Sequence, residues 1–590
     1  MTIYSADFET TTAAYSSEFS IVWAGAFVDI TKHDDDNAVN IFSDITDFMY
    51  YVENFFRNGD IIYFHNLKFD GSFIINALFE YGYEYVKGQK GLPPSKCFDA
   101  AISDMGTWYR IRISVPVAKR NGEGYCKMIE IRNSLCLVSG SVAQIGDSFG
   151  TRKRKLDIDY DAASFPHKMS TKEIEYLKAD VLIIAEVLNL LINEYGFEKL
   201  TAGSNAIGDF MKRFGGKTKF KGLFPELSKE IDEFCREAYR GGISWVNPKI
   251  RGNALGNGCT YDCNSEYPGM MHGQSGNMYP YDAPVYFEGE YQQDNKYPLW
   301  IARVSIAAER KPDKMPCMQI KRTNIFKENE WLDKIHDDGE PVEITITSVD
   351  LQLLKECYDI TSFEMIEGYK FKGCRGVFDK FIDHWNEIKM NSKGAKRQVA
   401  KLMMNSFYGK FGTRLFGFSK DVSYEGDKLK FTKDNGEERD AYYIPVACFV
   451  TAYGRRNLIH AGNANFDRLC YVDTDSVHLL GHDEAKGIEI HDKKLGAWKQ
   501  ESKWSRGKFI RQKTYVEDII GGELDIKCAG MPDSIKYSKY IGEDGMVHKM
   551  PAISFDGFKI GARWETGKLI AKQVKGGVLL LDTPFEIKAC

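Results

Sequence analysis

Apolar residues near the start of the chain follow the pattern of a buried sheet. Residues 3–8, 20–28 and 60–65 are short, largely apolar runs of strand length. Residues 170–196 begin with Ser-Thr-Lys-Glu, a helix-start signal, and continue with apolar residues at helical spacing. Strands followed by a helix predict an α/β domain that ends near residue 200.

Helical spacing returns at residues 378–411, where Gly394 predicts a break between two helices. Residues 275–375 are rich in Tyr, Gly and Pro and predict an inserted unit made mainly of strands, including 298–306 and 342–349. Residues 413–437 carry turn signals typical of a hairpin. The C-terminal stretch after Gly576 also predicts β structure.

Length and composition narrow the class of protein. At 590 residues the chain should hold about three to five structural units. A hydrophobic content of 43% excludes a disordered or fibrous chain. The sequence has no apolar run near the length of a membrane span and no secretory signal at its start, and its thirteen cysteines are odd in number. These features predict reduced thiols in a cytoplasm and no membrane partner.

The net charge of −5 conceals an uneven distribution. The first 60 residues hold eleven acids and two bases. Residues 387–414 hold seven bases against one acid, and residues 499–513 hold six against one, both interleaved with aromatic residues. Such blocks are usually solvated faces, but basic and aromatic residues together favour a track for a polyanion.

A first group of carboxylates has the spacing of a metal site. Asp7 and Glu9 lie two apart on a predicted strand, so both point to one face. Asp70 should lie at the carboxyl mouth of the strand at 60–65, and Asp180 on the helix at 170–196. Crowded carboxylates repel one another unless divalent cations lie between them, and two such cations promote phosphodiester hydrolysis.

Three further residues fit this chemistry. Tyr176 shares a helical face with Asp180 and could orient an attacking water, while Lys155 could neutralise the scissile phosphate. Asp157 could reach the same metals. Taken alone, these residues support a metal site and ordinary surface or core-edge carboxylates equally.

A second group surrounds a predicted hairpin. Asp473-Thr-Asp475 lies between apolar runs, which places acids at the hairpin tip, and Asp262 ends another strand closed by Pro268. On adjacent strands, Asp262 and Asp475 would hold two Mg²⁺ ions, with Asp473 and the carbonyl of Cys263 as further ligands. An isolated Asp-Thr-Asp is usually only a turn, but several such segments together make this less favoured.

Positive charge for phosphoryl transfer is available in the segment 389–405. Lys389, Arg397 and Lys401 could neutralise nucleotide phosphates. Arg397, Lys401 and Asn405 recur at intervals of four and therefore share one helical face.

Residues 7–10, 66–70 and 176–180 resemble, in order and spacing, the three motifs of the proofreading 3′–5′ exonucleases attached to DNA polymerases. The resemblance implies that the four acids bind metals. It also implies that a further set grips the single-stranded 3′ end: Thr10, His65, Asn66, Phe69, Phe73, Ser134, Leu135 and Tyr160.

Residues 261–268, 401–409 and 471–476 resemble the polymerase motifs of the B-family DNA polymerases. By this resemblance Tyr267 would stack under the sugar and exclude a 2′-hydroxyl, and Tyr408 would line the nascent base pair. Two more motifs imply contacts with primer and template: Lys513 and Tyr515 in a Lys-x-Tyr motif, and Tyr239, Arg240, Gly241 and Gly242 in a Tyr-x-Gly-Gly motif.

Residues 201–204, the compact length and the two insertions resemble the protein-primed subgroup of tailed bacteriophages. The subgroup implies Mg²⁺, replaceable by Mn²⁺, with DNA, dNTPs and a separate terminal protein as partners in the host cytoplasm. The first insertion would help hold that protein, and the second would encircle DNA. Glu266 departs from the subgroup, which usually has leucine before the sugar-selecting tyrosine.

The resemblance implies a multidomain protein of α/β and α+β parts. Rival readings are a reverse transcriptase or RNA polymerase, which leaves the nuclease set unexplained, and a non-catalytic DNA-binding protein, which the complete carboxylate sets disfavour. The expected units are a ribonuclease-H-like exonuclease domain at 1–203, a right-hand polymerase palm at 204–274 and 438–528, insertion 1 at 275–376, fingers at 377–412, insertion 2 at 413–437 and a thumb at 529–590.

Overall fold

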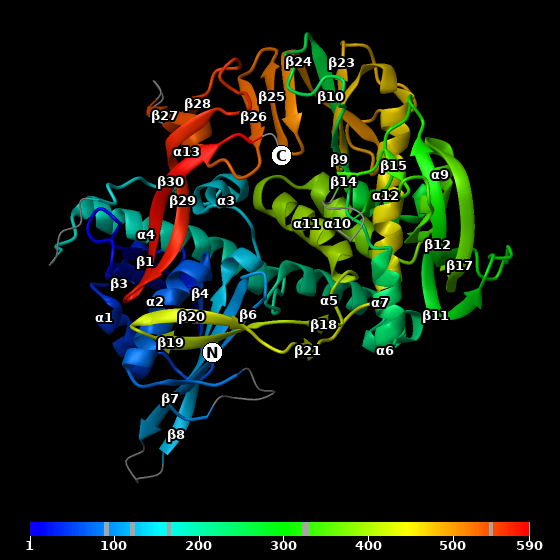
Figure 1. The fold of residues 1–590 in the computed structure, drawn as a ribbon. Helices are drawn as coiled ribbons and strands as arrows, with labels where there is room; N and C mark the ends of the chain where they lie inside the picture. Colours follow the sequence, from blue (N-terminus) through cyan, green and yellow to red (C-terminus); the bar gives the residue numbers. More distant parts are fainter. Residues whose placement is uncertain (88–93, 119–123, 162–166, 321–329, 542–546, 589–590) are drawn as a thin grey trace.

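A computed structural model describes residues 1–87, 94–118, 124–161, 167–320, 330–541 and 547–588 (Figure 1). The N-terminal part is built on an eight-stranded sheet. In spatial order its strands are β3 (Asn40–Phe42), β2 (Val22–Asp29), β1 (Ile3–Thr10), β4 (Ile61–Phe64), β8 (Gly124–Asn133), β7 (Trp108–Ala118), β6 (Cys97–Ile102) and β5 (Glu84–Tyr85).

Helices cover both faces of this sheet because its central strands are apolar on both sides. Ile62 and Phe64 of β4 pack with α1 (Ile45–Tyr50) and α2 (Leu67–Glu80). Ile61 and Tyr63 face α4 (Thr171–Asn189) on the other side. The predicted helix start is confirmed, since Ser170 and Glu173 form a capping box at the first turn of α4. A shorter helix, α3 (Val142–Phe149), packs against α4.

A second, seven-stranded sheet lies in the C-terminal half. Its spatial order is β26 (Leu524–Cys528), β25 (Thr514–Ile519), β24 (Trp498–Arg511), β10 (Gly258–Cys263), β23 (Ser476–Leu480), β22 (Leu469–Asp473) and β9 (Ser244–Val246). The long helix α12 (Ile444–Ala464) packs on one face, where Leu458 and Ile459 join Val472, Val477 and Leu479 in one core.

The inserted unit is a five-stranded sheet. It contains β11 (Tyr279–Glu288), β17 (Tyr358–Cys374), β12 (Leu299–Arg310), β15 (Lys334–Ile335) and β16 (Val342–Thr347). The strand predicted over 342–349 ends at Thr347, because the Thr347 side chain caps α9 (Ser348–Cys357) with Asp350 as its capping-box partner. The sequence reading missed this helix.

Two helices follow the inserted unit, as predicted. They are α10 (Asp379–Asn391) and α11 (Gly394–Phe407), and Gly394 begins the second with a φ of 53°. They pack on α5 (Ala202–Phe214), which leads through α6 (Lys217–Leu223) to α7 (Lys229–Glu237). Two short two-stranded sheets complete the fold: β13 (Gln319–Ile320) with β14 (Glu330–Trp331) in the inserted unit, and β18 (Phe416–Gly417) with β21 (Glu437–Glu438) after α11.

Two hairpins from later parts of the chain pack on the N-terminal part (Figure 1). The predicted hairpin at 413–437 contains β19 (Lys420–Glu425) and β20 (Lys428–Lys433), and Tyr424 stacks on Phe79 of α2 with ring centroids 5.3 Å apart. The C-terminal hairpin of β29 (Arg563–Val574) and β30 (Gly577–Glu586) also packs on α2. The remaining elements are α8 (Glu266–Met271), α13 (Asp533–Lys536), β27 (Tyr537–Ile541) and β28 (Val547–Pro551).

Among the described residues, no helix combines the length and the apolar character needed to cross a membrane.

Candidate functional sites: two carboxylate centres and a buried motif

The first carboxylate centre lies at the C-terminal part of β1, an interior strand of the eight-stranded sheet. Asp7 and Glu9 come from β1, and Asp180 reaches them from α4, so that one ligand atom of each lies within 4.8 Å of the others. Asp70 lies in the first turn of α2, and the nearby charge of Asp7 contributes to its raised pKa. Because β1 and β4 run parallel, with Ala6 opposite Phe64, the helix after β4 begins beside Asp7. The predicted convergence of these four acids is present, with Asp70 adjacent to a closer trio.

Burial and mutual repulsion disfavour the charged form of these acids. Burial, followed by the charge of Asp180, raises the pKa of Asp7 to about 7. Burial likewise raises the pKa values of Glu9, Asp70 and Asp180. Within the described part of the chain, Oδ1 of Asp70 and Oδ1 of Asp180 are buried without a hydrogen-bond partner. Unpaired carboxylate oxygens in a buried cluster suit a hard divalent cation, so the residues present fit the predicted metal.

A lysine and two tyrosines close this centre on one side. The Nζ of Lys155 donates hydrogen bonds to Oδ2 of Asp180 and to the hydroxyl of Tyr176. The hydroxyls of Tyr160 and Tyr176 are 2.8 Å apart. Burial lowers the pKa of Lys155, but Asp180 and Asp7 outweigh it and the pKa is raised, so this lysine stays charged. Asp157 is exposed and, like Asp70, lies outside the trio found among the described residues; its metal contact stays a prediction.

The residues expected to grip a DNA end divide into exposed and enclosed ones. Nε2 of His65 donates to the carbonyl of Gly140 at 2.8 Å, and Nδ1 lies 2.9 Å from the hydroxyl of Ser134. Ser134 is buried, and buried Phe73 packs against Gly577 of the C-terminal hairpin, so neither side chain presents a surface to DNA here. The other members retain exposed area: Thr10, Asn66, Phe69, Leu135 and Tyr160.

The second centre is built where three antiparallel strands meet. Ser476 pairs with Asp262 across β10 and β23, and with Asp473 across the tight turn between β22 and β23. Thr474 adopts a φ of 57° in that turn. The N–H of Cys263 donates to the carbonyl of Asp475 at 2.7 Å, which holds Asp475 beside the end of β10. The predicted hairpin with acids at its tip, next to the Asp262 strand, is therefore present.

The two aspartates show the electrostatics of a shared cation site. Burial, then the charge of Asp475, raises the pKa of Asp262 to about 7, and burial raises that of Asp475. The positive charge of Lys401 opposes both increases. A cation between these carboxylates would relieve their repulsion, so this pair also fits the predicted metal.

Asp473 is engaged differently from its neighbour. Its carboxylate accepts hydrogen bonds from Nζ of Lys513 at 2.7 and 3.0 Å and from the hydroxyl of Tyr471 at 3.1 Å. Asp473, predicted as a further metal ligand, is thus paired with Lys513, predicted to contact the primer. Tyr515 packs on Tyr471 below them, with ring centroids 5.2 Å apart.

The predicted cations border this second centre. Arg397, Lys401 and Asn405 are exposed along one face of α11. Lys389 donates a hydrogen bond of 2.8 Å to the hydroxyl of Ser265, two residues beyond the end of β10. Burial, then the charges of Arg397 and Lys401, lowers the pKa of Lys389. Three mutually repelling cations favour an anionic ligand between them.

Tyr267 is held in place by its neighbours. Its ring centroid lies 4.2 Å from that of Tyr408. A Cβ on Gly242 would lie 3.0 Å from the Tyr267 hydroxyl and 3.0 Å from Cγ2 of Thr474. Gly242 therefore allows the backbone of the Tyr-x-Gly-Gly motif to touch both the tyrosine and the hairpin turn. Glu266, beside Tyr267, is buried, and burial followed by the charge of Asp475 raises its pKa well above the ordinary value.

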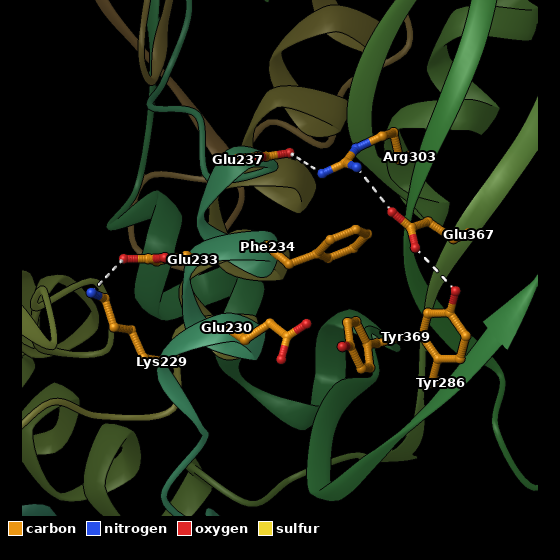
Figure 2. Close-up of a pocket in the computed structure, with 9 residues that line it drawn as sticks. All are labelled: Lys229, Glu230, Glu233, Phe234, Glu237, Tyr286, Arg303, Glu367 and Tyr369. Carbon is orange, nitrogen blue, oxygen red and sulfur yellow. Dashed lines mark hydrogen bonds and ion pairs between the residues drawn. The ribbon is translucent and has the colours of Figure 1, made fainter.

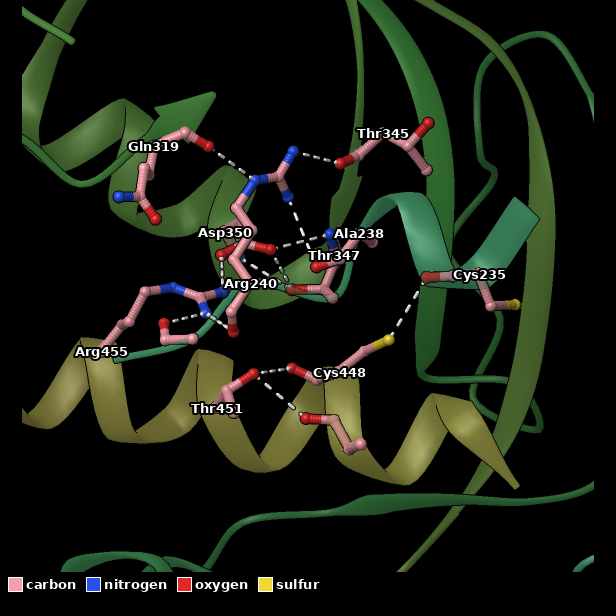
Figure 3. Close-up of polar contacts among 12 residues, drawn as sticks. Cys235, Ala238, Arg240, Gln319, Thr345, Thr347, Asp350, Cys448, Thr451 and Arg455 are labelled. Carbon is pink, nitrogen blue, oxygen red and sulfur yellow. Dashed lines mark hydrogen bonds and ion pairs between the residues drawn. The ribbon is translucent and has the colours of Figure 1, made fainter. Parts of the chain in front are cut away.

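Arg240 does not point toward a solvent-facing groove (Figure 3). Its guanidinium donates to the carbonyls of Gln319 at 3.1 Å and Thr345 at 2.8 Å, both in the inserted unit. Arg455 donates to the Arg240 carbonyl at 2.7 Å and forms a fully buried ion pair of 2.7 Å with Asp350. The Arg240 side chain thus makes structural contacts within the protein, and the template contact of its motif stays a prediction. Tyr239 also packs internally, where a Cβ on Gly412 would lie 2.8 Å from its hydroxyl, while Gly241 is exposed.

Two buried polar pairs escaped the sequence reading. Arg455 and Asp350 are separated by 105 residues, and His478 and Glu517 by 39. The two members of each pair lie on different elements far apart in the chain, so the spacing of residues along one helix or strand cannot reveal the pairing.

A separate pocket of about 830 Å³ lies between α7 and the inserted sheet (Figure 2). Arg303 bridges its two walls, with ion pairs of 2.9 Å to Glu367 and 3.5 Å to Glu237. Acidic and aromatic side chains dominate the lining: Lys229, Glu230, Glu233, Phe234, Glu237, Tyr286, Arg303, Glu367 and Tyr369.

Comparisons with known proteins agree with this arrangement. Residues 163–493 match the family described as DNA polymerase type B, organellar and viral. The chain is 38% identical over 604 residues to the DNA polymerase of Bacillus phage phi29, with 99% of each chain covered. It is 30% identical over 617 residues to that of Streptococcus phage Cp-1, covering 99% of this chain and 98% of the other. The structure of phi29 DNA polymerase complexed with primer-template DNA and incoming nucleotide substrates is similar over 100% of both chains, with a TM-score of 0.87 and 36% identity.

Proposed function

Because the chain belongs to the type B DNA polymerases of organelles and viruses, we propose that its two carboxylate centres are separate catalytic sites of one replicative enzyme. The chain is a DNA polymerase of the phage type with the multidomain fold of the phi29 enzyme. DNA synthesis is assigned to Asp262 and Asp475, and 3′–5′ proofreading to Asp7, Glu9, Asp70 and Asp180. The observation that carries this proposal is that each acid group converges beside its own sheet: ligand atoms of Asp7, Glu9 and Asp180 lie within 4.8 Å of one another, and the Cys263 N–H holds the Asp475 carbonyl beside the Asp262 strand.

At the synthesis site, Asp262 and Asp475 would hold Mg²⁺, with the carbonyl of Cys263 as a further candidate ligand. Mg²⁺, when bound, supplies Lewis acidity toward the primer 3′-hydroxyl and the nucleotide phosphates. Lys389, Arg397 and Lys401 attract and orient the triphosphate of the incoming nucleotide. Tyr267, fixed between Tyr408 and Gly242, excludes a 2′-hydroxyl by steric contact.

At the proofreading site, the same kind of cation would be held by the trio of Asp7, Glu9 and Asp180, with Asp70 beside it. The Tyr176 hydroxyl, held by Tyr160 and Lys155, is placed to orient a water. The Lys155 ammonium remains charged and can neutralise the phosphate that is being cleaved. The exposed members of the DNA-gripping set, such as Asn66 and Phe69, would receive the frayed 3′ end.

Strand displacement and processivity are assigned to the two hairpins that return to the N-terminal part. At their junction the Nζ of Lys575 lies 3.1 Å from a carboxylate oxygen of Asp427. A closed arrangement of this kind would retain DNA during synthesis. Deleting residues 419–434 should shorten the products made per binding event on a primed circular template. Products of unchanged length in the presence of a DNA trap would contradict the assignment.

Protein priming is assigned to the inserted unit, with a terminal protein as the partner. The acidic pocket beside α7 supports this, because it offers a concave, negatively charged surface that complements a basic protein segment. Deleting the whole insertion is a poor test, since Arg240 and Arg455 would lose the buried partners that it supplies. Charge reversal at Glu230 and Glu233, on the α7 wall of the pocket that the inserted unit completes, should instead weaken initiation on the protein hydroxyl. Extension of a DNA primer should remain normal, and equal effects on both reactions would argue against the assignment.

The two-site assignment is tested by a reciprocal pair of variants. Asp475→Asn should abolish primer extension and leave degradation of a single-stranded 3′ end intact. Asp180→Ala should do the reverse. Each variant should keep one activity, and that retained activity shows that the variant is folded. Loss of both activities in either variant would refute separate sites.

A further inference from the structure

His478 and Glu517 form a buried, hydrogen-bonded pair behind the second carboxylate centre. Both are almost inaccessible to solvent, at 1% and 2% exposed. His478 lies on β23 and Glu517 on β25, and Nδ1 of the histidine is 2.7 Å from Oε1 of the glutamate. Charged residues are rarely buried without a partner, and neither member of this pair belongs to the residues assigned to DNA or nucleotide. Its burial therefore calls for a role inside the sheet.

The pair is connected to the metal-binding hairpin through one hydroxyl. Nε2 of His478 lies 3.3 Å from Oγ of Ser476, and this Oγ donates to the carbonyl of Asp473 at 3.2 Å. Nδ1 faces the carboxylate of Glu517, and the Ser476 hydroxyl stands between Nε2 and the Asp473 carbonyl. The imidazole thus links the glutamate on one side to the hairpin turn on the other.

Other groups complete the surroundings of the pair. The Thr260 hydroxyl donates to Glu517 at 3.1 Å, and Nε1 of Trp504 donates to Thr260 at 3.3 Å. The imidazole ring also packs on Tyr471, Phe509 and Tyr515, with centroids between 5.0 and 5.5 Å away. The same ring is thus in contact with the tyrosine that bonds Asp473 and with the tyrosine of the Lys-x-Tyr motif.

Ser476 is the residue through which the His478–Glu517 pair would act on the hairpin. It pairs with Asp262 on one side and with Asp473 on the other, and it directly follows Asp475. The turn also contains Thr474 at a positive φ, which a non-glycine residue adopts only when its surroundings hold it. A fixed Ser476 therefore fixes the relative positions of the two aspartates assigned to the cation.

We propose that His478 and Glu517 are positioning residues that hold Ser476, and through it Asp262 and Asp475, in the geometry that binds the catalytic cation. This inference rests on the proposed assignment of DNA synthesis to those two aspartates. Neither residue touches substrate, and their contribution is made through the hairpin. Groups that orient metal ligands typically change metal affinity or activity by roughly 10–100-fold when they are altered.

The test uses full-length protein carrying Asp7→Ala and Asp180→Ala, so that Mg²⁺ acts only at the synthesis site. His478→Gln and Glu517→Gln are introduced singly and together. The Mg²⁺ concentration that gives half-maximal single-nucleotide incorporation should rise roughly tenfold in each. A second readout needs no turnover: Mg²⁺-dependent binding of the next dNTP to the enzyme on a dideoxy-terminated primer-template should weaken to a similar degree. The double variant should resemble the worse single variant, because both residues act through one chain of contacts.

A matched control separates positioning from packing. Phe509→Leu removes ring contacts with His478 and leaves the hydrogen bonds in place, so it should lower Tm without changing the Mg²⁺ requirement. If the His478 and Glu517 variants behave in the same way, with a changed Tm and an unchanged Mg²⁺ requirement, the inference is overturned. If the variants unfold, Thr260→Val, which removes one donor to Glu517, should shift the Mg²⁺ requirement in the same direction, and an unshifted value there also overturns it. Should Asp475→Asn retain extension, the underlying assignment would fail instead.

Discussion

The aromatic rings of Tyr267 and Tyr408 lie with their centroids 4.2 Å apart, on two elements that are far apart in the chain. Tyr267 belongs to α8, directly after the Asp262 strand, and Tyr408 follows α11 with its exposed cations. The contact joins the part that holds the acids to the part that would hold the nucleotide. Gly242 lies close to the hydroxyl of Tyr267. The Tyr267 ring therefore has little freedom to move aside for a sugar that carries a 2′-hydroxyl.

Replacing Tyr267 with valine should therefore relax the choice of sugar. The variant is expected to raise ribonucleotide incorporation relative to deoxynucleotide incorporation by at least about tenfold, since removing a steric barrier changes discrimination on that scale. The ratio of kcat/KM for the two nucleotides on one primer-template measures this. Tyr408→Phe, which keeps the ring contact, should leave the ratio unchanged; an unaltered ratio in the valine variant would remove Tyr267 from sugar selection.

The buried carboxylate of Glu266 should lower the free energy of unfolding. Its folded-state pKa is raised by burial, so the unfolded chain ionises more readily and the cost grows as pH rises above the ordinary glutamate value. Glu266→Leu should increase the free energy of unfolding at pH 8 by about 1–3 kcal/mol. Chemical denaturation at pH 5 and pH 8 would show a smaller gain at the lower pH. A loss of stability at both values would mean that this carboxylate is satisfied in the folded protein.

Lys155 should contribute to 3′-end degradation and not to DNA synthesis. Its Nζ donates to Asp180 and Tyr176, and no such bond links it to the second centre among the described residues. Lys155→Met should lower the rate of 3′-end removal by roughly 100-fold and leave extension of a matched primer unaffected. A 5′-labelled single strand and a primed template, assayed side by side, would report both. Lys153→Met provides the control, because Lys153 lies two positions away and pairs with Asp36 instead of the acid trio.

In the absence of a divalent cation, the stability of the folded protein should fall as pH rises. The pKa values of Asp7 and Asp262 are both raised to about 7, so between about pH 4 and pH 7 the folded state retains protons that the unfolded state has released. Tm measured in EDTA should decline over that interval and level off above it. Adding Mg²⁺ should raise Tm more at pH 8 than at pH 5, because the cation binds the ionised acids. A protein carrying both Asp7→Asn and Asp262→Asn should show a flatter profile, and an equally steep profile would assign the effect to other groups.

Local spacing was enough to predict much of the chemistry. Alternation along a strand places Asp7 and Glu9 on one face, and a helix-start signal at Ser170 sets the position of Asp180. A turn between apolar strands likewise places Asp473 and Asp475 at a hairpin tip. These relations involve residues within a few positions of one another, where backbone geometry alone decides which side chains share a face.

Packing between distant segments decided the rest. The guanidinium of Arg240 bonds carbonyls of the inserted unit 79 and 105 residues away, a contact that the local sequence does not predict. Asp473 and Lys513 likewise form an ion pair with each other that neither motif predicts by itself. The support of His478 by Glu517 arises only when β23 and β25 are assembled with β10 and β24 between them. A long polar side chain can satisfy many different partners, and the folded chain selects one of them because burial leaves unpaired donors and acceptors at a high cost.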